Sequence, residues 1–289
     1  MAARISVIVP CYNSRGTISK ALRSLENQTF KDFETIVVDD ASTDGSIDLI
    51  RKFKVKAIAL KENKGVSFCR NRGVEASSGK LLFFMDSDCW AESDWVERAV
   101  EGLSQPGVDV IAGKIRILDS TFFGDAVAEL GFPGGGNAGF ENMWKVSEDG
   151  FTNHVSSCNL GMTREIFEKS NGFDESLRRA QDAYLSFVLS RSNAGIKYLP
   201  HVVVYHQSMV SFREFVDNHL MRGKANRAFQ GKVVNIKPFV SLRFWSAKNI
   251  LRNNLFKPKL PLVFSLLFLS FVLQQAGYLR EWARKSINV

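Results

Sequence analysis

The sequence predicts an α/β protein in which a mostly parallel sheet is flanked by helices and followed by a helical, apolar C-terminal segment. Two observations predict this class. Short apolar runs alternate with amphipathic segments through the first 116 residues, and strand–helix–strand repeats of this kind build parallel sheets with helices on both faces. Beyond residue 206 the chain becomes basic and then strongly apolar.

Five apolar runs rich in Val, Ile and Phe have the length of buried strands. They are Ile5–Val9, Thr35–Asp39, Ala57–Leu60, Leu81–Met85 and Val108–Ile111. The segments between them have helical spacing, and we expect helices at Ser19–Asn27, Ser46–Phe53, Val66–Ala76 and Ser93–Leu103. Ligands of parallel sheets bind outside the carboxyl ends of the strands. Polar residues that follow these strands are therefore the first candidates for a site.

A glycine-rich stretch with weak periodicity, Asp119–His154, is expected to be a mobile loop over one end of the sheet or a tolerated surface insertion. Regular structure is expected to return after it. We expect a strand at Val155–Met162, helices near Arg164–Ser170 and Ala180–Ser192, strands at Lys197–Leu199 and Val202–Tyr205, and a basic helix at Ser211–Phe229.

Composition and charge narrow the class further. The 289 residues are 45% hydrophobic and 24% charged, which excludes a disordered or fibrous protein. Residues 207–289 hold 14 Lys and Arg against 3 Asp and Glu, whereas the preceding residues hold 24 against 27. The basic residues flank an apolar stretch instead of a base-stacking platform, so we expect no nucleic-acid partner. The four cysteines are far apart, which favours reduced cytosolic thiols over a disulfide framework or zinc site.

The C-terminal stretch has the composition of a membrane-associated helix. Lys257 and Lys259 precede twenty uncharged residues, Leu260–Leu279, and Arg280 follows them. Twenty helical residues span about 30 Å, close to the thickness of a bilayer's hydrocarbon core. We expect association with an anionic membrane surface, by a true span or an interfacial helix. The alternative is packing on the domain or on a second copy in a homo-oligomer. The apolar run Ile5–Val9 is too short for a signal peptide, which favours the cytoplasmic face of the membrane.

Acidic residues follow two of the expected strands. Asp86-Ser87-Asp88 comes directly after Leu81–Met85, and two carboxylates one residue apart can both approach a hard cation that bridges to phosphate. A solvated turn is the alternative. Asp39-Asp40 begins a second polar run, Asp39–Gly45. Helix capping accounts for its Ser, Thr and Asp residues, but not for two successive carboxylates at a strand end, so one of them is expected to meet a polar ligand.

Together these motifs resemble the family 2 glycosyltransferases of the GT-A fold, which is Rossmann-like. The resemblance runs over roughly residues 4–225 and is carried by ordered segments. They are Val7–Asn13, Gln28–Phe30, Val37–Gly45, Asn63–Gly65, Arg70–Gly73, Phe84–Asp88, Asn159, Gly172–Asp174 and Asp182. The resemblance implies a GT-A catalytic domain over 1–232, with 233–289 as a basic, apolar membrane-association region.

The resemblance also implies a nucleotide-sugar donor, a UDP- or GDP-sugar, and residues that bind it. Pro10, Tyr12 and Asn13 would line the nucleotide pocket. Asp40 would accept a hydrogen bond from the base, and Arg70 would lie beside the base or the diphosphate.

A divalent cation, Mn²⁺ or Mg²⁺, is implied by the same resemblance. Asp86 would touch the ribose or the metal, and Asp88 would bind the metal directly. His206, at the end of an expected strand, would be a further ligand, although a lone histidine at a strand end is more commonly structural.

The implied general base is Asp182. A carboxylate beside the acceptor hydroxyl removes its proton as the new bond forms, which is typically worth about 10²–10⁴ in rate. Helix capping is the alternative role. The chain departs from the family pattern at Gln181, where relatives commonly hold Glu. Asn159, Gln181 and Arg222 are candidates for contacts with the acceptor or the diphosphate.

The expected reaction is inverting, metal-dependent transfer of a single sugar to an acceptor hydroxyl, on a lipid-linked glycan. Processive members of the family carry Gln-x-x-Arg-Trp near His219–Gly223, and this chain keeps only Arg222 of that motif. One alternative is transfer to a polyprenyl phosphate, which is already ionised and needs no base. Another is a non-catalytic protein that binds nucleotide sugars or serves as a scaffold.

Overall fold

The structure is a computed structural model that describes residues 5–118, 121–132, 134–209, 211–233, 235 and 237–287, with backbone only for 285–287. Its strands are β1 (Ile5–Cys11), β2 (Phe33–Asp39), β3 (Lys56–Ala59), β4 (Leu81–Phe84), β5 (Cys89–Ala91), β6 (Val110–Leu118), β7 (Leu160–Thr163) and β8 (Ile196–Gln207). Its helices are α1 (Ile18–Glu26), α2 (Ser46–Ile50), α3 (Val66–Glu75), α4 (Trp95–Leu103), α5 (Phe122–Ala128), the 3₁₀ turn η1 (Gly136–Ala138), α6 (Phe140–Met143), α7 (Arg164–Lys169), α8 (Gln181–Arg191), α9 (Phe212–Gln230), α10 (Lys237–Asn254) and α11 (Leu260–Ile287).

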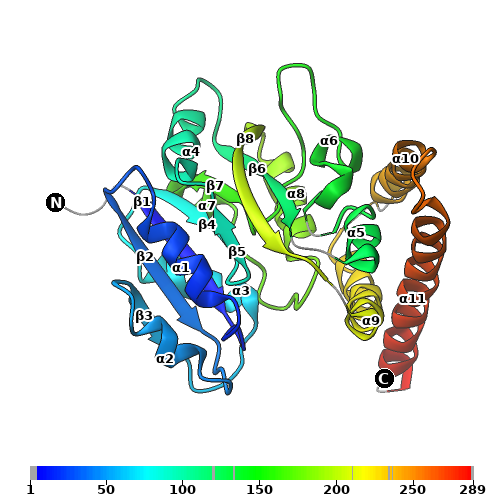
Figure 1. Cartoon of the computed structure of the whole chain (residues 1–289), viewed down its shortest axis with the longest axis horizontal. Helices are drawn as coiled ribbons and strands as arrows, with labels where there is room; N and C mark the ends of the chain where they lie inside the picture. The colour runs from blue at the N-terminus through cyan, green and yellow to red at the C-terminus, as the bar shows by residue number, and fades with distance from the viewer. Residues whose placement is uncertain are drawn as a thin grey trace. The chain divides into compact units, whose positions relative to one another are not determined.

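The strands form one sheet in the order β3-β2-β1-β4-β7-β6-β8-β5 (Figure 1). β1 is parallel to both β2 and β4, and β3 is parallel to β2. β7 is antiparallel to β4 and to β6, and β5 is antiparallel to β8. The sheet is therefore parallel from β3 to β4 and mixed beyond β4, so the strand–helix repeats predict parallel pairing correctly for β1–β4 but not for β5 and β6.

Helices cover both faces of the sheet, as the sequence predicts. The ring of Phe83 meets Trp95 of α4 with 5.6 Å between centroids, whereas the neighbouring Phe84 meets Phe167 of α7 at 5.9 Å. Adjacent residues of a strand point to opposite faces, so α4 and α7 pack on opposite sides of β4. Around Phe84 the apolar core also includes Ile8 of β1 and Val74 of α3.

Several strand boundaries differ from the expected ones. The expected run Val108–Ile111 is the beginning of the longer strand β6, and the two short runs at 197–199 and 202–205 are one strand, β8. β5 is only three residues long, too short to show an alternating pattern. The strand expected at Val155–Met162 is confined to β7.

The expectation of a mobile loop over Asp119–His154 is wrong for the part between residues 122 and 143, where three short helical segments form. Residues 119, 120 and 133 lie outside the described part of the chain. The segment forms α5, η1 and α6. Buried Ala126, Val127 and Leu130 share an apolar cluster with Phe215 of α9 and Val263 of α11. Packing against helices distant in the sequence thus stabilises helices whose local periodicity is weak.

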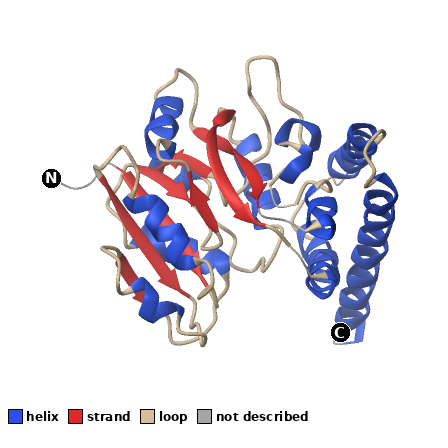
Figure 2. Ribbon diagram, in the orientation of Figure 1, coloured by secondary structure: helices blue, strands red, loops and turns tan. Residues whose placement is uncertain are grey.

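The chain divides into two compact units. One comprises residues 1–114 and 146–206, and the other comprises residues 115–145 and 207–289. Apart from the strand ends of β6 and β8, the regular structure of the second unit is helical (Figure 2). It includes α10, which lies within the region 233–289 that the sequence predicts to be helical, although Phe239–Phe256 shows no clean apolar stripe. The division at residue 232 expected from the family resemblance concerns function and stays a prediction.

Candidate active site

The candidate site lies at the carboxyl ends of β1, β2 and β4. In the parallel register Cys11 pairs with Asp39, and Ile8 pairs with Phe84. The polar residues that follow these strands are therefore at the same edge of the sheet, where parallel sheets bind ligands. All of them belong to the first unit.

Asp40 and Asn13 connect the loops at this edge. Both carboxylate oxygens of Asp40 accept backbone N–H groups at the start of α3, from Lys64 at 2.7 Å and Gly65 at 2.8 Å. The Asn13 side chain accepts the backbone N–H of Thr43 at 2.9 Å. These bonds order the rim of the candidate pocket.

Pro10 and Tyr12, the other two residues expected in the nucleotide pocket, lie in and just after β1. Pro10 is buried in the strand, and the side chain of Tyr12 is 52% exposed. Tyr12 therefore offers the most accessible aromatic surface at this rim. The contact of these residues and of Asp40 and Asn13 with a nucleotide stays a prediction.

Arg70 is a buried cation at the centre of the site. It projects from α3 with a side chain that is 1% exposed, and its Nη2 donates to Asp86 Oδ1 at 2.6 Å. Burial disfavours the charged form, but the carboxylates of Asp86 and Asp182 outweigh it and raise the pKa of Arg70. Its Nε and Nη1 are buried and have no hydrogen-bond partner among the described residues. Two donors are thus left for a ligand.

Asp182 lies in the first turn of α8, near Arg70. Burial raises the pKa of Asp182 above the ordinary aspartate value, and the opposing effects of Arg70 and of hydrogen bonds from Ser157 only partly offset this rise. Asp182 Oδ1 and Gln181 Oε1 are buried and lack partners within the described part of the chain. A carboxylate with a raised pKa and an unpaired oxygen is suited to accept a proton.

The start of α8 is fixed by Ser186. Its hydroxyl donates to the backbone carbonyl of Asp182 at 2.6 Å and accepts the backbone N–H of Val155 at 3.0 Å. This links the segment before β7 to the helix that carries Asp182. Sequence reasoning did not assign Ser157 or Ser186 a role, because serines in turns and helices carry no distinctive pattern.

Asp88 and His206 are brought together by the pairing of β5 with β8. Cys89 lies opposite His206 in this antiparallel register, and His206 Nε2 is 3.4 Å from Asp88 Oδ1. Ligand atoms of Asp88, Cys89 and His206 all lie within 4.8 Å of one another. Burial raises the pKa of the Cys89 thiol well above its usual value, so the carboxylate and imidazole are the better ligands for a hard cation.

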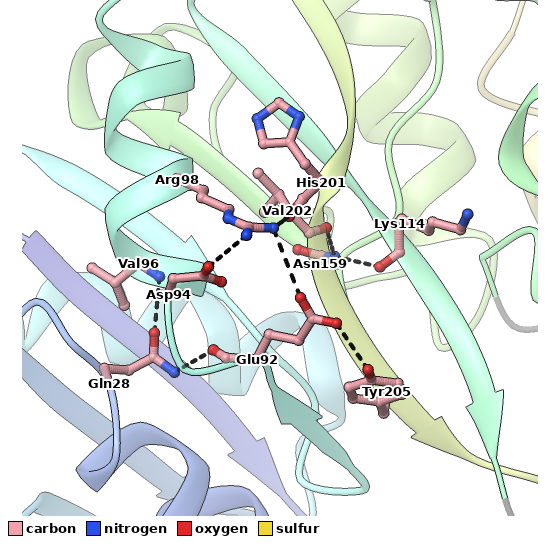
Figure 3. Close-up of polar contacts among 10 residues, drawn as sticks. All are labelled: Gln28, Glu92, Asp94, Val96, Arg98, Lys114, Asn159, His201, Val202 and Tyr205. Carbon is pink, nitrogen blue, oxygen red and sulfur yellow. Dashed lines mark hydrogen bonds and ion pairs between the residues drawn. The ribbon is translucent and has the colours of Figure 1, made fainter.

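Asn159 is engaged in hydrogen bonds within the protein, and its expected contact with the acceptor or diphosphate stays a prediction. Its Nδ2 donates to the carbonyls of Lys114 and Val202 at 2.8 and 2.9 Å (Figure 3), and its Oδ1 accepts from Trp95 Nε1 at 2.9 Å. The side chain is 1% exposed. A Cβ at Gly113 would lie 2.2 Å from Asn159 Nδ2, so this glycine leaves room for the amide. Both ends of the amide are engaged within the core.

A second polar cluster positions β5 against β8. Glu92, which follows β5, accepts the hydroxyl of Tyr205 at 2.8 Å and lies 3.8 Å from Arg98 of α4 (Figure 3). Gln28 donates to the Glu92 carbonyl at 2.7 Å and accepts the N–H of Val96 at 2.9 Å. These bonds hold the strand pair that places Asp88 beside His206. Sequence reasoning quoted Gln28 only as part of a motif and did not find Glu92.

Arg222 lies in the second unit, on α9. Its guanidinium carbon is 3.7 Å from the ring centroid of Phe132. A cation over an aromatic face is a stabilising contact in its own right, and the expected contact of Arg222 with the diphosphate stays a prediction.

Comparisons with known proteins show the family to which this chain belongs. The family model for glycosyl transferase family 2 matches residues 6–170, more than half of the chain. The chain therefore belongs to glycosyl transferase family 2, and it is a glycosyltransferase. It is 26% identical over 254 residues to the glycosyltransferase AglE of Haloferax volcanii, covering 83% of this chain and 79% of AglE. It is 29% identical over 223 residues to GlyA of Streptococcus pneumoniae, covering 73% of this chain and 30% of GlyA.

Solved structures show the same GT-A fold. The mannosyltransferase PcManGT from Pyrobaculum calidifontis, in complex with GDP-Man and Mn²⁺, has a TM-score of 0.62 and 19% identity, over 97% of this chain and 84% of that protein. TarS of S. aureus, in complex with UDP-GlcNAc, has a TM-score of 0.58 and 19% identity, over 98% and 92%. The GT-A fold expected from the sequence is confirmed.

Proposed function

We propose that this glycosyltransferase moves one sugar from a nucleotide-sugar donor to an acceptor hydroxyl with inversion at the sugar carbon. The observation that carries the proposal is the buried cluster of Arg70, Asp86 and Asp182, in which donor and acceptor atoms are left without partners. Buried polar groups are normally paired. The unpaired atoms of Arg70 and Asp182 therefore indicate that a polar ligand binds here. The nucleotide sugars bound to PcManGT and TarS support a donor of this class.

In this proposal Asp182 is the general base. Its raised pKa, caused by burial, favours uptake of the proton from the acceptor hydroxyl. Direct attack of that hydroxyl on the sugar carbon inverts the configuration there and needs no enzyme nucleophile. The unpaired Nε and Nη1 of Arg70 donate to an oxygen of the donor, and Asp86 holds the guanidinium in place.

Asp88 and His206 would hold Mn²⁺ or Mg²⁺. The fit rests on a carboxylate oxygen and an imidazole nitrogen 3.4 Å apart, at the same sheet edge as Arg70. When bound, the cation supplies positive charge that stabilises the leaving nucleoside diphosphate. The Mn²⁺ in the PcManGT complex supports this assignment.

The proposed acceptor is carried on a lipid-linked glycan at the cytoplasmic face of a membrane. Among the described residues one helix, Leu260–Arg284 of α11, is long and apolar enough to cross a bilayer, with a mean hydropathy of 1.7. The apolar length of this helix and the excess of Lys and Arg over residues 207–289 support contact with a membrane.

The donor and metal assignment is tested by thermal unfolding with UDP or GDP, with and without Mn²⁺. We expect one diphosphate to raise the Tm of the wild type in the presence of Mn²⁺, because a ligand that binds only the folded state stabilises it. Asp88→Asn should lose most of this metal-dependent rise. Asp48→Asn, at an exposed aspartate paired with Arg51, is the matched control. An equal rise in Asp88→Asn and the wild type contradicts the metal assignment.

A further inference from the structure

The helix α11 has two opposite faces of unusual character. Its buried side carries Val263, Leu266, Ser270, Gln274 and Gly277. Its outward side carries large apolar residues spaced mostly three or four positions apart, the pattern of a single helix face. This aromatic face comprises Phe264 (58% exposed), Phe268 (66%), Phe271 (59%), Val272 (43%), Leu279 (58%) and Trp282 (52%). The side open to solvent is thus largely apolar, although Ser265, Gln275 and Arg280 are also exposed, whereas the buried side includes Ser270 and Gln274.

The buried side of α11 is held closely against α9. A Cβ on Gly223 of α9 would lie 2.1 Å from the carbonyl oxygen of Gln274, and one on Gly277 would lie 2.1 Å from that of Leu220. The two backbones therefore touch where these glycines meet. Tyr278 also donates its hydroxyl to Gln230 at 2.7 Å.

The segment just before α11 is held by two lysines that pair with one buried carboxylate. Glu129, after α5, has a side chain that is 4% exposed, and it pairs with Lys257 at 3.0 Å and Lys259 at 2.8 Å. Contacts thus fix α11 to its own unit both at its start and in its second half. An arrangement in which lipid surrounds the whole helix would have to break them.

If α11 crossed a bilayer, α9 would lie in the hydrocarbon core as well, because the two helices are packed together. α9 carries Arg213, Arg222 and Lys224, and charged side chains facing lipid tails are strongly disfavoured. A helix with one face on protein and an aromatic face outward fits a position in the plane of the membrane interface, where Trp and other aromatics are favoured.

The positive charge of residues 207–289 indicates what kind of partner the aromatic face contacts. Residues 207–289 hold 14 Lys and Arg against 3 Asp and Glu. A second copy would bring the same positive charge, whereas anionic headgroups bring the opposite one. The segment before α11 adds further apolar surface, since Leu255 is 55% and Phe256 is 96% exposed.

We infer that α11 lies in the plane of an anionic membrane surface, with its aromatic face in the lipid and its opposite face kept on α9. This inference makes the proposed membrane location specific. It does not depend on the transfer reaction, and its test has no activity readout.

Vesicle sedimentation of the full chain tests the contact. We expect binding to vesicles of phosphatidylcholine with phosphatidylglycerol, and at least tenfold weaker binding to phosphatidylcholine alone. Phe264→Gln/Phe268→Gln/Phe271→Gln should bind the anionic vesicles at least tenfold more weakly with an unchanged Tm, because all three rings are exposed. Leu118→Gln/Phe122→Gln changes exposed apolar residues outside α11 and should bind as the wild type does. Equal binding of the two variants overturns the inference.

Depth measurements distinguish an in-plane helix from a span. The four native cysteines are buried, so a fluorophore on Phe264→Cys, Phe268→Cys, Phe271→Cys or Leu279→Cys labels α11 selectively. Positions 264 and 279 are about 22 Å apart along a helix. Quenching by brominated lipids should report similar, shallow depths at all four sites. Depths that pass through a maximum near 268–271 indicate a span and overturn the inference. So does an absence of vesicle binding combined with self-association that the triple variant abolishes.

Discussion

Arg70 and Asp86 form an ion pair of 2.6 Å in which the arginine side chain is 1% exposed and the aspartate 28%. The pair joins α3 to the end of β4, at the edge where the candidate site lies. It leaves Nε and Nη1 of the guanidinium without partners among the described residues. Burial raises the pKa of Asp182, and the guanidinium of Arg70, which also pairs with Asp86, acts against that rise. In the proposed mechanism, Arg70 therefore connects donor binding to the protonation state of Asp182.

Arg70→Gln should weaken donor binding and change the pH profile together. Without the cation, burial acts unopposed and the pKa of Asp182 rises further, so the acidic limb of kcat/KM moves to higher pH. We expect donor KM to rise about tenfold, as for loss of a charge-assisted hydrogen bond worth roughly 1.5–3 kcal/mol. Steady-state kinetics across pH measure both effects. Arg72→Gln, at an exposed pair with Glu75, is the control, and an unmoved acidic limb in Arg70→Gln contradicts the coupling.

Asn159→Ala should lower stability without weakening donor binding. The substitution leaves the buried Trp95 N–H and the carbonyls of Lys114 and Val202 without their partner. Unsatisfied buried groups cost about 1–3 kcal/mol each before relaxation, so we expect a loss of roughly 2–4 kcal/mol in urea unfolding. Donor KM should stay within about twofold. If Asn159→Ala keeps its stability but has a much higher donor KM, the result supports the ligand contact that the family resemblance implies for Asn159.

His219 should make the stability of the second unit depend on pH. Burial lowers the pKa of His219 to about 4, and its Nδ1 donates to the Phe215 carbonyl at 2.8 Å. The unfolded chain takes up a proton near pH 6.5, whereas the folded chain does not. Stability is therefore full above about pH 6.5 and is lost as the pH falls toward 4, by on the order of 3 kcal/mol.

Denaturant unfolding at pH 7 and pH 4.5 measures this loss. His219→Leu should reduce the difference between the two pH values but not abolish it, because burial also lowers the pKa of His154, to about 3. His201→Leu, at an exposed position, should keep the full difference. If His219→Leu and the wild type lose the same stability on acidification, the neutral buried histidine is not the cause.

The features of the fold and of the candidate site that could be predicted from the sequence are those determined by local sequence patterns. Short continuous apolar runs and the rule for parallel strands predicted the sheet edge where Asp40 and Asp86 lie. The family resemblance predicted a shared role for Asp88 and His206, and the pairing of β5 with β8 brings them together. The family resemblance also implies a ligand contact for Asn159, which stays a prediction. The order of motifs along a chain does not tell which way a side chain points, and in the structure this side chain bonds to Trp95, Lys114 and Val202. The helices α5 and α6 depend on packing with α9–α11, which no local window contains.

The pH profile of transfer should show the raised pKa of Asp182 directly. Because burial raises this pKa and the base acts only when deprotonated, the rate should fall with decreasing pH at values above those at which an ordinary aspartate titrates. Asp182→Asn should remove this limb from its residual activity. A limb that persists in Asp182→Asn belongs to another group.

The central claim, that Asp182 removes the acceptor proton, is tested most directly by the turnover of Asp182→Asn. The measurement is metal-dependent release of nucleoside diphosphate from UDP- or GDP-sugars in the presence of membrane lipid-linked glycans. We predict a fall in kcat of about 10²–10⁴, with the Tm rise caused by the nucleoside diphosphate and Mn²⁺ unchanged. Full turnover by Asp182→Asn would contradict the account and point to an acceptor, such as a phosphate, that needs no base.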